Sequence, residues 1–329
     1  IMTRNIKIIT TEDSGGLIDM VVVLNKKLNQ KGYKSSIIKI NKYKDRKINN
    51  INKGDYVIFQ MSGYGYHNKG LPFWLVNQIK RIKKKSFCLG IHFHELNINH
   101  KFWDPKFIIM TLQKYINIRL LRYCDYWVTS NIQYARWLKK YSLNDKNYIC
   151  PVHSNIDHKI VKVKKNKRIA VLFGTSGSRV LIYRNYFHIL KAWILKNNLI
   201  LYDVGPKIKD EFVKDLIKNQ PNIKICGKLS TKKIRDLFSK AYFGIFSTPD
   251  DLIDKSGILA TYCKYKVCPI NLDNYYHNSK SLSKQRFLKI LPDKNKYRNQ
   301  IIKINSINFE LSKKNNINNY IKVYLKNYK

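Results

Sequence analysis

The sequence predicts an α/β protein with two domains, each built on a parallel β-sheet. The chain has 329 residues, 44% of them hydrophobic, which suits two cores of about 150 residues better than one. Short apolar runs alternate with amphipathic stretches, as in proteins with parallel sheets. Each half also opens on the same order of strand, glycine turn and helix. We therefore expect two facing Rossmann-like domains, with ligands in a cleft at the carboxyl ends of the strands.

The first domain is expected over residues 1–150, and its elements follow from where the apolar runs begin and end. An amphipathic stretch that ends at Gly32 predicts a helix after the first strand, and the next apolar run completes a βαβ unit. Strands are expected at 6–10, 33–40, 56–61, 87–94, 126–130 and 148–150, and helices near 17–30, 71–85, 106–123 and 132–141.

A polar, lysine-rich stretch at 151–167 is expected to link this domain to a second one at 168–305. In the second domain Ser230 is placed to accept a hydrogen bond from the first turn of a helix. The final segment, 306–329, has a polar helical pattern. Strands are expected at 169–173, 199–204, 223–226, 242–246 and 267–272, and helices near 180–197 and 231–240.

The composition is strongly basic, with 63 Lys and Arg against 21 Asp and Glu and a formal net charge of +42. Such a surface attracts anionic lipid headgroups and nucleic acid, and charge alone does not choose between them. No apolar run of about 18 residues is present, so we expect no membrane-spanning helix, and we see no secretory signal. Six scattered cysteines without a C-x-x-C pair predict a reducing compartment.

Two turns of the second domain have the residues that a diphosphate needs. In the first, glycines allow close approach of the backbone, the helix start supplies N–H groups and an arginine adds a forked cation. The second opens a short helix before a strand and combines a lysine with backbone N–H groups. An ordinary βα turn and a capped surface helix are the alternatives. The candidate residues are Gly174, Thr175, Gly177, Ser178 and Arg179 in the first turn, and Lys255, Ser256, Gly257 and Ile258 in the second.

A polar cluster ends the fourth predicted strand of the first domain. Alternation along a strand places His92 and His94 on one face, with Glu95 at or just past the strand's carboxyl end. A carboxylate or imidazole there suits a base beside a sugar hydroxyl, so Glu95 and His94 are the candidate catalytic residues. The alternatives are a core role for His92 and a metal bound by His-x-His-Glu, although no second ligand cluster is visible.

Two further loops of the first domain are candidates for contact with an acceptor. Gly15 and Gly16 open a helix, and Tyr64 and Tyr66 lie in a Gly-Tyr-Gly-Tyr stretch after a strand. Aromatic faces pack on the C–H surfaces of sugars, so the tyrosines suit a sugar-facing loop. His92 is included with this group. A tight turn without a ligand and core packing of the tyrosines are the alternatives.

Taken in order, these pieces resemble the bacterial GT-B glycosyltransferases of surface polysaccharide biosynthesis, which include enzymes for lipopolysaccharide, O-antigen and capsule. Each piece is weakly specific, and the ordered set covers about residues 5–272. The pieces are Ser14-Gly15-Gly16, Ser62-Gly63-Tyr64-Gly65-Tyr66 with Gly70-Leu71-Pro72, Phe93-His94-Glu95-Leu96, Cys124 to Ser130, Phe173 to Arg179, Gly205-Pro206-Lys207, and Lys255-Ser256-Gly257 through Cys268-Pro269-Ile270.

The resemblance implies a nucleotide-sugar donor on the second domain, an acceptor on the first, no obligatory metal or other cofactor, and a final helix that crosses back to the first domain. Many retaining members carry two glutamates, at positions that here are Ile253 and Thr261. Neither is acidic, so the stereochemical outcome stays open.

The sequence therefore predicts a hexosyltransferase-like enzyme. It would move a sugar from a nucleoside diphosphate to a hydroxyl of a lipid-linked glycan, in the cytoplasm and peripherally bound to the inner face of the cytoplasmic membrane. Specific nucleic-acid recognition is not expected, because no binding signature is present. The two rival interpretations are a basic nucleic-acid-binding protein and a metal-dependent hydrolase centred on His92, His94 and Glu95.

Overall fold

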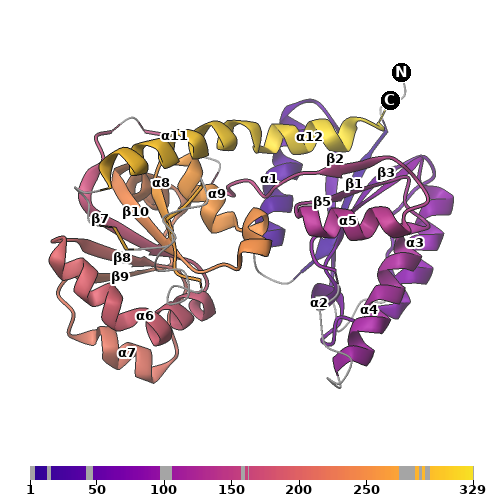
Figure 1. Ribbon diagram of the computed structural model, residues 1–329. Coiled ribbons are helices and arrows are strands. Elements are labelled where there is room, and N and C mark those ends of the chain that lie inside the picture. The colour runs from indigo at the N-terminus through magenta and orange to yellow at the C-terminus, as the bar shows by residue number, and fades with distance from the viewer. Residues whose placement is uncertain are drawn as a thin grey trace. The chain divides into compact units, whose positions relative to one another are not determined.

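The computed structural model describes residues 4–12, 16–41, 47–96, 106–156, 160–161, 163–273, 286–288, 291–292 and 297–328. The chain forms two compact units (Figure 1). Unit 1 comprises Ile1–Pro151 and Ile317–Lys329, and unit 2 comprises Val152–Asn316. The lysine-rich stretch was expected to form a linker between the two domains. Unit 2 instead begins at Val152, and its first strand starts at Asn166.

Unit 1 is built on a parallel sheet in the order β2-β1-β3-β4-β5-β6. The chain runs from β1 to β2 on one side, and then crosses past β1 to β3 on its other side, so the strand order reverses between β1 and β3. Ligands of such sheets bind at the carboxyl ends of the strands beside this point. The strands are β1 (Ile6–Thr11), β2 (Ser35–Ile40), β3 (Tyr56–Met61), β4 (Cys88–Phe93), β5 (Tyr126–Thr129) and β6 (Asn147–Ile149).

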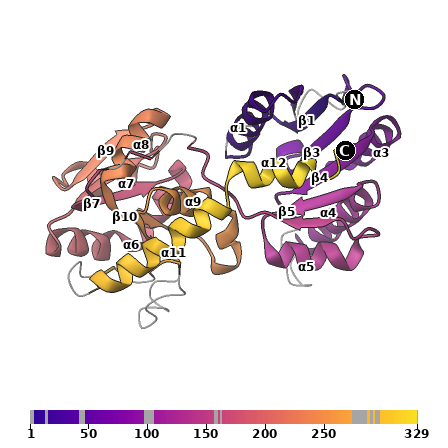
Figure 2. The same cartoon turned by 90° about the horizontal axis from the view of Figure 1, so that it is seen from above.

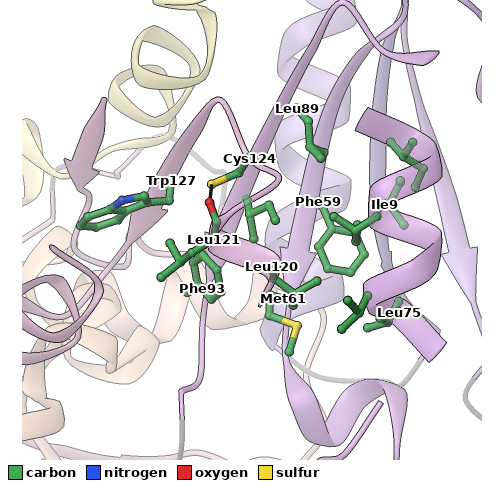
Figure 3. Packing of buried hydrophobic residues seen from close by; sticks show 14 of the residues in the cluster. Ile9, Phe59, Met61, Leu75, Leu89, Phe93, Leu120, Leu121, Cys124 and Trp127 are labelled. Atoms are coloured by element: carbon green, nitrogen blue, oxygen red, sulfur yellow. Dashed lines mark hydrogen bonds between the residues drawn. The ribbon is translucent and has the colours of Figure 1, made fainter. Parts of the chain in front are cut away.

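Both faces of this sheet are covered, because side chains on one strand alternate between two cores. On β3, Phe59 and Met61 join one cluster, which Figure 3 shows around Leu75 and Leu120, and Ile58 joins the other. The helices of unit 1 are α1 (Gly16–Gln30), α2 (Gly63–Tyr66), α3 (Phe73–Lys85), α4 (Lys106–Leu121), α5 (Ile132–Tyr141) and α12 (Ile317–Leu325).

The C-terminal helix α12 belongs to unit 1 and lies over its sheet (Figure 2). It packs there through tyrosines. Tyr320 donates a hydrogen bond to the carbonyl of Cys150 at 2.7 Å, and Tyr56 donates one to the carbonyl of Tyr324. The expected single helix over 306–329 is in fact two, because α11 ends at Lys314 in unit 2 and α12 begins at Ile317. Asn315 and Asn316, both weak helix formers, separate them.

Unit 2 contains a parallel sheet in the order β11-β10-β7-β8-β9, which is the strand order of a Rossmann domain with its reversal between β7 and β10. Its strands are β7 (Asn166–Phe173), β8 (Ile200–Val204), β9 (Ile223–Gly227), β10 (Ala241–Phe246) and β11 (Cys268–Asn271). Its helices are α6 (Ser176–Lys196), α7 (Glu211–Lys218), α8 (Thr231–Lys240), the 3-10 helix η1 (Asp250–Lys255), α9 (Gly257–Lys264) and α11 (Arg298–Lys314).

The predicted cap of α8 is confirmed, since the Ser230 side chain accepts a hydrogen bond from the backbone N–H of Lys233 at 3.4 Å. Helix α7 was not predicted, although Asp210 caps it in the same way. All six cysteines are free thiols. None of the helices in the described part of the chain has both the length and the apolar character needed to cross a bilayer.

Candidate functional site

Three neighbouring strands of unit 2 reach glycine at their carboxyl ends. Gly174 follows β7, Gly205 follows β8 and Gly227 ends β9. The N–H of Gly174 donates to the carbonyl of Val204 at 3.2 Å, and that of Gly205 to the carbonyl of Gly227 at 3.0 Å. A Cβ on Gly205 would lie 2.1 Å from the carbonyl oxygen of Gly174. Glycine is therefore required for the backbone segments to come this close.

Helix α6 starts directly beyond this edge. Thr175 is its N-cap and accepts a hydrogen bond from the N–H of Ser178 at 3.3 Å, while the Ser178 hydroxyl donates to the Thr175 carbonyl at 3.0 Å. Thr175 and Gly177 are exposed, and a Cβ on Gly177 would meet open space. The first turn thus presents backbone N–H groups at the positive end of a 21-residue helix, which suits an anion.

The two turns that the sequence singled out lie together. A Cβ on Gly174 would come within 3.1 Å of the side chain of Ile258, in the first turn of α9. Ser256 caps α9 by accepting a hydrogen bond from the N–H of Leu259 at 3.2 Å, and a Cβ on Gly257 would touch only Val152, at 3.9 Å. Lys255, at the end of η1, is half-buried. Two helix starts and a lysine are therefore grouped at one edge of the sheet.

Arg179 does not provide the cation that the sequence suggested. It is 1% exposed, and its guanidinium forms an ion pair with Asp203 and donates to the carbonyl of Pro206. Tyr183 donates to the other oxygen of Asp203 at 2.8 Å. Burial raises the pKa of Asp203, although Arg179 and Tyr183 act to lower it. Because the guanidinium of Arg179 is hydrogen-bonded to Asp203 and to the carbonyl of Pro206, it positions the loop after β8 instead of binding a phosphate.

A cavity of about 490 Å³ opens beside the same glycine edge. The sequence motifs do not predict this cavity, although Gly205-Pro206-Lys207 is among the pieces that carry the resemblance. Its walls are mainly apolar, with lysines at Lys207 and Lys214, and its size suits the base or ribose of a nucleotide. It is lined by Arg179, Gly205, Pro206, Lys207, Ile208, Lys214, Ile217, Ile225, Cys226 and Gly227.

In unit 1 the two candidate catalytic residues lie where β4 ends, and both are half-buried. The Ser62 hydroxyl donates to a carboxylate oxygen of Glu95 at 2.8 Å, and Nε2 of His94 is hydrogen-bonded to the side-chain oxygen of Gln60 at 2.6 Å. Gln60 and Ser62 come from the end of the neighbouring strand β3. The carboxylate and the imidazole are thus held in place by side chains and still reach the surface.

His92 differs from the prediction that it contacts an acceptor. Its side chain is completely buried, and Nδ1 is hydrogen-bonded to the hydroxyl of Tyr324 on α12 at 2.6 Å. The prediction that His92 and His94 lie on one face of the strand is confirmed, because the centroids of their rings are 3.9 Å apart. A buried ring cannot meet a substrate, so the core alternative holds for His92.

The acceptor loops are divided between core and surface. Tyr66 is buried, stacks on Phe59 at 5.4 Å and donates to the carbonyl of Gln60 at 2.9 Å, so the prediction of a sugar-facing Tyr66 is wrong. Tyr64 is 37% exposed, and its hydroxyl accepts a hydrogen bond from Gln113 at 3.2 Å. Gly16 is exposed at the start of α1, and Gly15 lies outside the described residues.

No group of three or more His, Cys, Asp and Glu side chains in the described ranges is arranged to hold a metal ion. The His-x-His-Glu segment illustrates the reason. His92, His94 and Glu95 are hydrogen-bonded to Tyr324, Gln60 and Ser62, from α12, β3 and the turn after β3. The three side chains therefore have separate partners instead of a shared centre.

No protein-family model and no curated protein matches the sequence, whereas solved structures do match the fold. A glycosyltransferase from Rickettsia africae aligns over 100% of both chains with a TM-score of 0.60 and 13% identity. A protein named as a UDP-N-acetylglucosamine 2-epimerase, from Listeria monocytogenes, aligns over 94% of this chain and 90% of its own, with a TM-score of 0.57 and 10% identity.

The pneumococcal O-GlcNAc transferase GtfA, solved in complex with UDP and GlcNAc, is a longer protein. It aligns over 84% of this chain and 58% of its own length, with a TM-score of 0.55 and 12% identity. At such identities the similarity establishes the architecture of the chain and leaves its reaction to be argued from its own residues. The chain has the GT-B fold, with a Rossmann-like α/β domain in each of its two units.

Proposed function

We propose that this chain is a glycosyltransferase that moves a sugar from a nucleoside diphosphate to a hydroxyl of a glycan acceptor. The observation that carries the proposal is the carboxyl edge of the sheet in unit 2. There the glycine ends of β7, β8 and β9 meet the start of α6, and the start of α9 packs against Gly174. An edge lined with backbone N–H groups at the reversal of strand order suits a diphosphate.

Departure of the nucleoside diphosphate builds negative charge on its phosphate oxygens. The N–H groups that open α6 and α9, together with Lys255, offset this charge without needing to reorganise. The cavity lined by Gly205, Pro206 and Ile225 receives the nucleoside part of the donor. Arg179 acts indirectly, by holding the loop at Gly205 and Pro206 against Asp203.

The acceptor binds unit 1 in this proposal. Glu95 takes the proton from the acceptor hydroxyl or orients that hydroxyl, and His94 supports the same group. The reaction then needs no obligatory metal or other cofactor. The acceptor is lipid-linked and belongs to a surface polysaccharide, and the net charge of +42 holds the enzyme at the inner face of the cytoplasmic membrane.

Thermal-shift measurements against a panel of sugar nucleotides test donor binding. We expect one base and sugar to raise the Tm at millimolar concentration, because a ligand that binds only the folded state stabilises it. Release of the matching nucleoside diphosphate with a glycan acceptor should then fall about 10²- to 10⁴-fold in Glu95→Gln. Ser62 can still donate to the amide oxygen of this variant, so the fold is retained.

Two outcomes would contradict the proposal. A folded protein that no sugar nucleotide stabilises, but that binds DNA in a salt-dependent manner, would favour the nucleic-acid interpretation. The second candidate function is that of a sugar-nucleotide epimerase, which the similarity to the Listeria protein favours. Conversion of a UDP-sugar to its epimer in the absence of acceptor would identify that activity.

A further inference from the structure

A second, larger cavity of about 940 Å³ lies at the opposite edge of the sheet in unit 2. Lys165 precedes β7 by one residue, Tyr242 is the second residue of β10, and Lys266 comes two residues before β11. These are the amino ends of the strands, whereas Gly174 and Gly205 mark the carboxyl ends. Residues of α11, including Ile302 and Phe309, line the cavity as well.

Apolar side chains line the cavity and are exposed to solvent. Val161 and Val163 both contribute to the lining, together with Lys165. They are 39% and 40% exposed, and Ile302 on α11 is 54% exposed. An apolar patch of this kind beside a cavity marks a surface for an apolar ligand or a membrane.

The cavity is also basic. The ammonium groups of Lys266 and Lys313 lie 4.1 Å and 4.8 Å from the centroid of the same Phe309 ring. Glu310 is the one acidic residue of the lining, and its carboxylate is paired with Lys313 at 2.7 Å. Burial, together with the charge of Lys266, lowers the pKa of Lys165 to about 7. A ligand with a negative charge would relieve this crowding of cations.

One observation indicates that a ligand completes the site, and a second concerns the position of Lys266. Ser239 lines the cavity, is 3% exposed, and its hydroxyl has no hydrogen-bond partner in the described part of the chain. A buried polar atom left in this state is costly. Lys266 adopts φ of +53°, directly after the residue that caps the end of α9, where glycine is the usual choice. The chain thus accepts a backbone cost and places a lysine above Phe309.

We propose that this cavity binds an anionic phospholipid of the membrane surface. The lipid phosphate lies on Lys266 and Lys313, the acyl chain lies along Val163 and Ile302, and a glycerol or ester oxygen bonds the Ser239 hydroxyl. This lipid site would provide the membrane contact of the proposed function, and in this respect the inference rests on the proposed function. It occupies the other edge of the sheet from the donor, so lipid binding and donor binding can fail separately.

Flotation with vesicles of phosphatidylcholine, with and without phosphatidylglycerol, tests the site. The wild-type protein should float only with the anionic vesicles. Lys266→Gln/Lys313→Gln should weaken binding roughly 30-fold, since each lysine near the surface contributes about 1 kcal/mol. The matched control is Lys232→Gln/Lys233→Gln on α8, which removes the same charge from exposed positions outside the cavity lining and should change binding by less than about threefold.

The apolar part has its own pair of variants. Val163→Ser/Ile302→Ser should weaken binding at least roughly tenfold, and Leu143→Ser/Leu195→Ser, which alters two exposed leucines outside the cavity, should not. Lys266→Gly separates binding from stability, because it should weaken flotation while the Tm stays the same or rises.

Equal losses in the cavity variants and their controls would overturn the proposal, since binding would then follow general charge alone. Equal flotation with neutral vesicles, or none with either kind, would also overturn it. The thermal shift with the sugar-nucleotide panel is measured on the same variants. Retained donor binding with lost flotation supports the lipid site, whereas a protein that floats as proposed but binds no donor leaves the lipid site standing and removes the transferase.

Discussion

The hydroxyl of Tyr324 lies 2.6 Å from Nδ1 of His92, although the two residues are 232 positions apart in the sequence. This contact fixes the ring of His92 in the core of unit 1. The ring of His94 stacks beside it at 3.9 Å and is hydrogen-bonded to Gln60. The C-terminal helix therefore reaches the catalytic candidates through the buried ring of His92, and Tyr324 is also hydrogen-bonded to Gln60, the partner of His94.

Tyr324→Phe should lower both stability and turnover. Loss of the hydroxyl removes a buried hydrogen bond from His92, which costs about 1–2 kcal/mol in the free energy of unfolding. In the proposed transferase, kcat should also fall because His94 loses its fixed neighbour, while the KM for the donor stays unchanged. Urea unfolding and steady-state kinetics measure the two effects.

Tyr328→Phe is the matched control, since Tyr328 is on the same terminal segment and donates to the carbonyl of Arg4 at 2.6 Å. It should cost similar stability without the loss of kcat. Equal kinetic losses in both variants would show that the terminal segment acts only through stability.

A second prediction concerns Arg179, whose substitution should lower stability instead of weakening phosphate binding, as its sequence context would suggest. Arg179→Ala leaves the carboxylate of Asp203 buried without its cation, and breaking such a pair costs about 3–5 kcal/mol. We expect a large drop in the midpoint of urea unfolding, and not merely weaker donor binding. The double variant Arg179→Met/Asp203→Leu should recover much of this loss, because it leaves no isolated charge. A stable Arg179→Ala protein that fails only in donor binding would restore the phosphate role.

The glycine edge of unit 2 provides a third prediction. Gly205→Ala places a Cβ 2.1 Å from the carbonyl oxygen of Gly174, so the loops must separate and the unfolding free energy should fall by about 2 kcal/mol or more. The donor-induced Tm shift should disappear with it. Gly177→Ala is the internal contrast, because its Cβ meets open space in the first turn of α6. That variant should be neutral or up to about 1 kcal/mol more stable. Similar losses in both variants would contradict this interpretation.

Most of the architecture could be predicted from the sequence, because apolar runs and glycine turns report local structure directly. β3 and α5 have the bounds that their patterns predict, at Tyr56–Met61 and Ile132–Tyr141. Helix α7 was missed because its eight residues offer little more than two turns of pattern. The lysine-rich stretch before β7 has the composition of a linker, because its charged residues mask the pattern of Val161 and Val163, which line a cavity.

The candidate site was predictable as a set of loops but not in its contacts. Turns at strand ends could be placed near a ligand, since the carboxyl ends of parallel strands share one edge. The burial of Arg179 and His92 depends on Asp203 and Tyr324, which are distant partners that no local pattern indicates. Tyr66 shows the same limit, because an aromatic side chain suits a sugar-facing loop and a core equally well.

Lys165 leads to a prediction about pH. Its ammonium donates to the carbonyls of Phe238 and Tyr265 at 2.8 Å and 2.6 Å, and burial lowers its pKa from 10.5 to about 7. Between these two values the unfolded chain holds a proton that the folded protein has released. The free energy of unfolding therefore gains from Lys165 as the pH rises through this window, and the gain is lost progressively as the pH falls from 10.5 to about 7.

Urea unfolding of the wild-type protein and of Lys165→Met at about pH 7 and about pH 9 tests this sign. The wild-type protein should gain about 1–2 kcal/mol more than the variant over that interval, because methionine has no proton to release. Buried thiols such as Cys263, whose pKa is raised to about 12, are present in both proteins and cancel in the comparison. Lys167→Met, at an exposed position, should keep the wild-type dependence. If Lys165→Met keeps it as well, the amine of Lys165 is not desolvated, and the cavity beside it is open to water.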